Sequence, residues 1–205
     1  MPIQTGRRHF LIGAGAVLGA TVMTGNSLNV LAAQSGDVSA DHFMLTAHDW
    51  VPNNAHLPVL QYQGAITRPR DGMDLASTME QIFNENGWPP QWRWGIYPFH
   101  HYHTEGHEVL GVFAGEAQVM LGGPGGRTVT MKKGDVVVLP TGTGHRCLQA
   151  SDDFQVVGAY PPGEHADINR SAPDEAMKER IRTTSFPNSD PVTGEGGPLT
   201  RLWQS

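Results

Sequence analysis

Three histidines and one glutamate have the residue types and the spacing of a metal site. His101 and His103 are two residues apart, Glu108 begins the next apolar run, and His145 follows a glycine-rich turn. Side chains two residues apart on a strand point to the same face, so His101 and His103 can approach one ion together. Three imidazoles and a carboxylate bind divalent transition metals and leave one or two coordination positions open. We therefore expect one ion of iron, manganese, copper, nickel or zinc, among which these donors do not choose.

Neighbouring side chains are expected to line such a site. Tyr97 and Phe99 share the face of His101, so they either line the cavity or belong to the core. Cys147, two residues beyond His145, also points inward on this pattern. It is either a thiol ligand or, as is commoner for a free cysteine, a small apolar filler. We expect Tyr97, Phe99 and Cys147 to be substrate-lining residues.

Two residues of the same segment are candidates for proton transfer. Glu108 can leave a metal ion to accept a proton from a substrate. His107 is expected at the rim of the site, as is His100, either as an ordinary rim residue or as a hydrogen-bond donor or proton shuttle. Catalytic roles are therefore predicted for Glu108 and His107.

Short β-strands are predicted to position these residues. Between residues 95 and 160, apolar runs of strand length alternate with glycine turns at 122–126 and 133–135. This pattern is typical of an antiparallel sandwich or barrel. The predicted strands are Val109–Phe113, Ala117–Leu121, Thr128–Met131, Val136–Leu139 and Phe154–Tyr160.

Helices are predicted only outside this region. Apolar residues recur at helical spacing in Asp71–Asn86, and Gly87 follows where a C-terminal cap would lie. A second helix is expected near Ala172–Ile181. Residues 88–94 hold two prolines and three tryptophans, so we expect a stiff connector that packs over the barrel end or forms a ligand platform.

Two motifs of this sequence resemble the signatures of the cupin superfamily. The first comprises Gly95, His101, His103, Glu108 and Gly115, with five, one, four and six residues between them. The second comprises Gly134, Pro140, Gly142 and His145, with five, one and two residues between them; it departs from the signature only at Gln149, where cupins have asparagine. That asparagine is not a metal ligand in cupins, so the departure leaves the site intact.

The resemblance implies an all-β fold, a single antiparallel jelly-roll barrel over residues 43–165 with one or two peripheral helices. It also implies that His101, His103, Glu108 and His145 hold a metal inside the barrel; the alternative is a cupin that has lost its metal and keeps a plain pocket. The chain is similar to small bacterial cupins without an assigned activity. Residues 166–205 are expected to form a helix and a surface wrap.

The first 33 residues have the pattern of an export signal. Arg7 and Arg8 are the only charged residues there, and a short, weakly apolar stretch follows them. The arginine pair followed by Phe10-Leu11 resembles a twin-arginine signal; the alternative is an ordinary secretory signal. Cleavage after Ala32 or Ala33 would leave a tether at 34–42 and a periplasmic protein without stable membrane insertion. The twin-arginine translocase is then a transient partner.

Charge and cysteine content exclude other classes. The formal net charge is −6, and removal of residues 1–33 leaves 12 basic against 20 acidic side chains, a charge of −8. An acidic chain of this kind is not expected to bind nucleic acid. A single cysteine excludes a disulfide framework.

Two classes of function remain. The first is a metal-dependent enzyme acting on a small chelating or anionic substrate, with oxygenase or oxidoreductase chemistry favoured over isomerase or lyase chemistry. The second is a non-catalytic cupin that binds or stores a metal or a small ligand. Many cupins dimerise through edge strands, so a homodimer is compatible with either class.

Overall fold

Antiparallel strands dominate the computed structural model, which describes residues 38–204. The predicted signal peptide and the start of the tether lie outside these residues. Three helices lie outside the sheets: α1 (Leu75–Glu85), α2 (Glu175–Thr183) and α3 (Pro198–Leu202). The strands are β1 (Asp41–Phe43), β2 (Val59–Tyr62), β3 (Pro90–Trp94), β4 (Glu108–Ala114), β5 (Glu116–Leu121), β6 (Arg127–Lys132), β7 (Val136–Leu139), β8 (His145–Ala150) and β9 (Gln155–Ala159).

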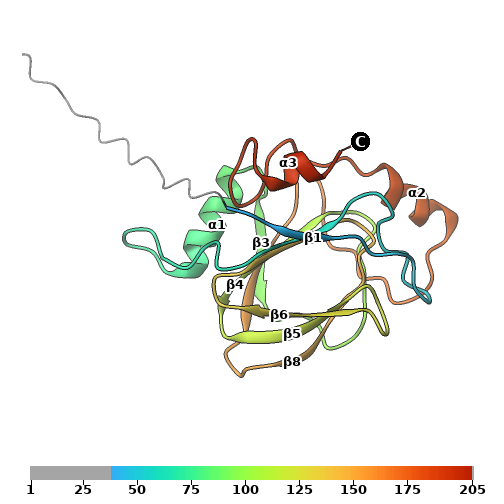
Figure 1. The fold of residues 1–205 in the computed structure, drawn as a ribbon, viewed down its shortest axis with the longest axis horizontal. Coiled ribbons are helices and arrows are strands. Elements are labelled where there is room, and N and C mark those ends of the chain that lie inside the picture. The colour runs from blue at the N-terminus through green and yellow to red at the C-terminus, as the bar shows by residue number, and fades with distance from the viewer. Residues whose placement is uncertain (1–37, 205) are drawn as a thin grey trace, which may run out of the picture. The chain divides into compact units, whose positions relative to one another are not determined.

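The strands form two sheets that face each other (Figure 1). The larger sheet has the order β1-β2-β7-β4-β9-β3, and the smaller has the order β6-β5-β8. Every pairing within them is antiparallel. The all-β, antiparallel fold class predicted from the sequence is therefore confirmed.

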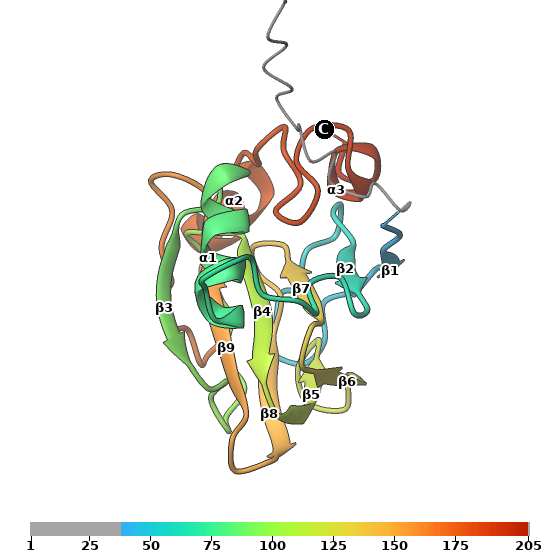
Figure 2. The same ribbon diagram turned by 90° about the vertical axis from the view of Figure 1, so that its left-hand side faces the viewer.

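Strand alternation in β4 divides the buried residues between two cores. Leu110 and Val112 pack in the core between the two sheets. Val109 packs in a second core on the outer face of the larger sheet, which α1 covers (Figure 2). Because both faces of this sheet are buried, a central strand such as β7 is apolar throughout.

The helix predicted at 71–86 is α1, which begins at Leu75. Asp74 is its N-cap and accepts a hydrogen bond from the Ser77 backbone nitrogen at 2.7 Å, which places residues 71–73 outside the helix. Gly87 has a φ of +80°, the left-handed conformation expected after a helix C-terminus.

Two segments differ from the sequence-based expectation. The expected connector at 88–94 contains the edge strand β3, which pairs with β9; Pro90 is tolerated because it begins the strand at a sheet edge. Residues 101–103 are not a regular strand, although His101 forms an isolated bridge with His145.

The C-terminal segment contributes to the core of the molecule. Leu199 and Trp203 are buried in the outer core together with residues of α1 and the larger sheet. The indole nitrogen of Trp203 donates to the Pro58 carbonyl oxygen at 2.9 Å. Within residues 38–204, no helix is long and apolar enough to cross a membrane.

Candidate metal centre

Backbone pairing brings the histidines of the two motifs together. The segment after β3 runs along β8: the Cys147 nitrogen donates to the Tyr97 carbonyl oxygen at 2.9 Å. Further along, His145 donates to the His101 carbonyl oxygen at 2.9 Å, and His101 donates back at 3.2 Å. The His101 and His145 rings therefore lie side by side, with centroids 4.0 Å apart.

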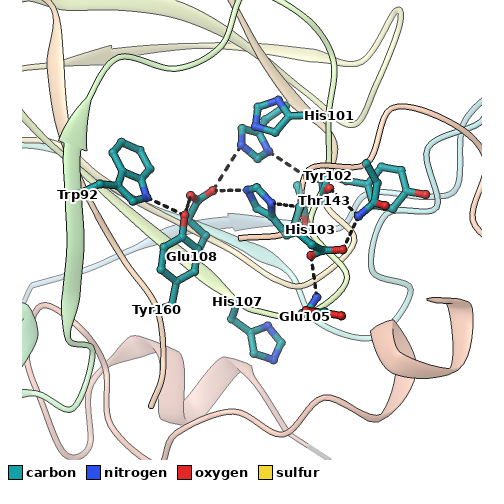
Figure 3. A network of polar contacts seen from close by, with 12 residues as sticks. Trp92, His101, Tyr102, His103, Glu105, His107, Glu108, Thr143 and Tyr160 are labelled. Atoms are coloured by element: carbon teal, nitrogen blue, oxygen red, sulfur yellow. Dashed lines mark hydrogen bonds and ion pairs between the residues drawn. The ribbon is translucent and has the colours of Figure 1, made fainter. Parts of the chain in front are cut away.

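Four buried side chains converge inside the barrel. Ring nitrogens of His101, His103 and His145 all lie within 4.8 Å of one another. Glu108, the first residue of β4, places Oε2 at 3.4 Å from Nε2 of His103 (Figure 3). Oε2 lies at the same distance from Nε2 of His145. The structure thus brings together the four residues expected to bind metal.

Each imidazole is oriented by a backbone carbonyl. Nδ1 of His101 lies 3.2 Å from the Phe99 oxygen, and Nδ1 of His145 lies 3.1 Å from the Thr143 oxygen. Nδ1 of His103 lies 2.6 Å from the Asp167 oxygen. A carbonyl oxygen only accepts hydrogen bonds, so each Nδ1 carries its hydrogen and each Nε2 is left as the metal-binding atom.

Unsatisfied polar atoms show that this donor set fits a divalent metal. Nε2 of His103 and Oε2 of Glu108 are buried, and neither has a hydrogen-bond partner among residues 38–204. Buried polar atoms of native proteins are normally paired. Imidazole nitrogens with one carboxylate oxygen suit iron, manganese, copper, nickel or zinc. His101, His103, Glu108 and His145 would therefore hold such an ion.

The protonation states suit metal binding. Burial lowers the pKa of His101 to about 2 and that of His145 to about 4, so both are neutral at neutral pH. Burial alone would raise the pKa of Glu108, but the facing His103 lowers it to about 2. Burial alone would lower the pKa of His103, but Glu108 raises it. Metal binding would require Nε2 of His103 to be unprotonated.

Glu108 is also held by a hydrogen-bond chain that sequence analysis missed. The Tyr160 hydroxyl donates to Oε1 of Glu108 at 2.5 Å and accepts from Nε1 of Trp92 at 2.9 Å (Figure 3). Burial raises the pKa of Tyr160, so the hydroxyl stays a donor. Strand alternation could have placed Tyr160 inside the barrel, but its position opposite Glu108 depends on the β4–β9 register, in which Leu110 pairs with Gly158.

A cavity of about 400 Å³ opens onto the four side chains. This volume is in the range of small-molecule sites. Among the substrate-lining predictions, Tyr97 lines the cavity. Phe99 lies outside its lining and stacks on Tyr97, with ring centroids 4.8 Å apart, while the half-buried Cys147 also lies outside it.

The structure places the ring of His107, the residue before β4, on the side away from the Glu108 carboxylate (Figure 3). Its ring is fully buried, 4.9 Å from the Trp203 ring between centroids, and its Nδ1 accepts from the Thr141 nitrogen at 3.0 Å. The expected rim position is therefore corrected, because the fold buries this ring completely. His107 contacts the C-terminal segment and does not line the cavity.

Comparisons with known proteins agree with this fold. The family described as Cupin domain matches residues 95–157. The uncharacterized protein YjlB of Bacillus subtilis (strain 168) is 38% identical over 156 residues, which cover 75% of this chain and 90% of that protein. The chain belongs to the cupin superfamily.

Solved structures with which the chain aligns include three bacterial proteins. An uncharacterized double-stranded β-helix protein of Klebsiella pneumoniae is 14% identical, with a TM-score of 0.31 over 76% of this chain and 100% of that one. A predicted oxalate decarboxylase of Thermotoga maritima is 14% identical, with a TM-score of 0.28 over 62% and 96%. Streptomyces albus HEPD, solved with 2-hydroxyethylphosphonate and Fe(II), is 12% identical, with a TM-score of 0.24 over 72% and 30%.

Proposed function

We propose that this cupin is a metal-dependent enzyme of the oxidoreductase or oxygenase type, acting on a small chelating or anionic substrate. One observation carries the proposal. Three carbonyl-oriented imidazoles and Glu108 converge at the inner end of a cavity large enough for a small molecule. A site that only stored metal would need no such open volume beside its ligands.

The residues of the site have distinct proposed roles. His101, His103 and His145 would hold the metal through Nε2, and Glu108 would hold it through Oε2. When bound, the metal supplies Lewis acidity and, if it is iron or copper, the capacity to activate dioxygen. Tyr160 holds Oε1 of Glu108, which leaves Oε2 as the ligand atom; when Oε2 is not coordinated, it can accept a proton from a substrate.

Elemental analysis of the protein purified without added metal tests the metal site. We expect about one equivalent of iron, manganese, copper or nickel per chain, and at least a tenfold loss in His101→Ala, because a ligand nitrogen is removed. The control His56→Ala removes an exposed histidine and should retain the metal. Circular dichroism would verify that both variants fold.

Oxygen consumption by the metal-containing protein then tests the catalytic part. A screen of small hydroxy and keto acids should reveal a substrate whose saturable turnover disappears in His101→Ala. Equal metal content in wild type and His101→Ala would contradict the metal site. Metal binding with ligand-induced thermal stabilisation but no turnover would instead identify a binding or storage cupin.

We further propose that the protein is exported to the periplasm by the twin-arginine route. The support is the sequence Arg7-Arg8 followed by Phe10-Leu11 and a weakly apolar stretch. Replacement of both arginines by lysine should leave unprocessed precursor in the cytoplasm, as measured by cell fractionation. Undiminished export of that variant would show that another route is used.

A further inference from the structure

The cavity wall presents apolar surface to whatever it binds. Leu110 and Ile96 line it with hydrocarbon, and Trp92 and Tyr160 line it with aromatic rings. The polar atoms of both rings are already engaged, because the indole nitrogen of Trp92 donates to Tyr160 and the Tyr160 hydroxyl donates to Glu108. These four side chains therefore offer a ligand aromatic rings and hydrocarbon rather than hydrogen bonds.

The cavity also lacks a cation for a highly charged ligand. Among residues 38–204, Arg93 is the sole lysine or arginine that lines it, and its Nε and Nη2 atoms both lie 2.6 Å from the Glu80 carboxylate. A divalent ion held by Glu108 and three neutral histidines would leave one net positive charge. That charge matches a single anionic group and does not match a di- or triphosphate.

Exposed apolar side chains gather at the same cavity. Trp94 is 71% exposed, and Tyr97 and Ile168 are each 44% exposed. All three line the cavity, whereas the other large exposed apolar residues of the described chain do not; these are Met44, Met73 and Leu148. Single exposed apolar side chains are ordinary on protein surfaces, whereas a cluster of them beside a cavity indicates a ligand-binding surface.

We infer that the cavity takes a small molecule with an apolar ring as its body and a single anionic, chelating oxygen group as its head. The inference of an anionic, chelating head group depends on the proposed metal site. The preference for a ring rests on the wall and mouth residues and does not depend on the metal. Trp92, Trp94 and Tyr97 would contact the ring, since aromatic side chains favour offset-stacked or edge-to-face contacts.

Two matched acids test this inference by isothermal titration calorimetry. Mandelate and lactate carry the same α-hydroxycarboxylate and differ by a phenyl in place of a methyl group. We expect mandelate to bind the metal-containing protein at least about tenfold more tightly than lactate, because the ring becomes buried. Trp94→Ala should reduce this ratio at least about threefold and leave lactate unchanged, while Met44→Ala, another exposed apolar residue, should alter neither acid.

The outcomes separate this inference from the proposed function. Metal uptake together with a mandelate-to-lactate ratio near one would overturn the ring preference and leave the metal site standing. A ratio that Trp94→Ala does not change would overturn the placement of the ring against Trp94. Undetectable binding of mandelate would also overturn it. Failure to take up metal, with a tenfold preference for mandelate retained by the metal-free protein, would overturn the proposed function and support the ring-binding cavity.

Discussion

Each imidazole of the proposed metal site is fixed by one carbonyl oxygen, but these carbonyls differ in their sequence separation from the histidine. His101 and His145 use the carbonyls two residues before them, so the local backbone orients both rings. His103 instead uses the carbonyl of Asp167, whose carboxylate accepts hydrogen bonds from the backbone nitrogens of Thr104 and Glu105. The orientation of His103 therefore depends on the segment after β9.

Glu164 gives this region a pH-dependent stability. Its Oε2 accepts a hydrogen bond from the His107 nitrogen at 2.7 Å, and burial raises its pKa from 4.5 to about 7. Between these values the folded state holds a proton that the unfolded state has lost. The contribution of protonated Glu164 to the stability of the folded state is fully present below pH 4.5 and is lost as the pH rises through 7.

Glu164→Gln should therefore gain stability relative to wild type as the pH rises from 5 to 8. The expected gain is on the order of 1–2 kcal/mol, reduced from the full effect because solvent reaches this half-buried carboxyl. Urea unfolding at several pH values would measure it. The control Glu116→Gln replaces an exposed glutamate on β5, and parallel pH profiles for wild type and Glu164→Gln would contradict the prediction.

At the scale of elements, β3, β4 and β9 form one wall of the cavity by sharing an inward face. Trp92 of β3 pairs with Gly158 of β9, which in turn pairs with Leu110 of β4. A Cβ atom on Gly158 would lie 2.1 Å from Cε2 of Trp92, so the indole occupies the space that a side chain would take. Glycine at 158 therefore allows Trp92 to reach Tyr160.

Gly158→Ala should displace the Trp92 indole and break its hydrogen bond to Tyr160. Overpacking of this kind lowers the free energy of unfolding by about 1–3 kcal/mol. Chemical denaturation monitored by tryptophan fluorescence would measure the loss. Gly95→Ala is the matched control, because a Cβ atom there meets nothing within 4 Å. Equal stability of the two variants would count against this packing.

At the scale of the whole molecule, the two cores share the larger sheet but differ in what covers them. The inner core lies between the sheets and extends to the metal-binding residues. The outer core is closed by α1 and by the C-terminal residues Leu199 and Trp203. His107 links the proposed metal site to the C-terminal segment. It directly precedes Glu108, and its ring packs against that of Trp203.

Trp203→Ala should destabilise the protein by about 3–5 kcal/mol, because it removes a buried indole and leaves a cavity. It also leaves the Pro58 carbonyl without its partner. Thermal or urea unfolding would measure the change, with the exposed neighbour Gln204→Ala as control. A loss below about 1 kcal/mol would mean that the C-terminal segment is only loosely attached.

Local patterns in the sequence were sufficient to predict part of the fold and part of the candidate site. Strand alternation and turn glycines predicted an antiparallel β fold, and the two motifs resembled those of cupins and named the four residues that the structure brings together. These features depend on side chains a few residues apart, for which strand geometry alone decides direction. The same alternation, applied to His107, would have placed it outside the barrel opposite Glu108.

Only the tertiary structure decided which distant residues complete the site. The pairing of Tyr160 with Glu108, the carbonyl of Asp167 beneath His103 and Ile168 at the cavity mouth all join segments more than 50 residues apart. The β4–β9 register sets the contact between Tyr160 and Glu108, since a shift by one residue turns the side chains of a strand to the other face. The path of the chain after β9 sets the other two contacts. The spacing of the histidines predicted the metal centre, whereas the shape of its cavity depends on how the sheets and the C-terminal segment pack.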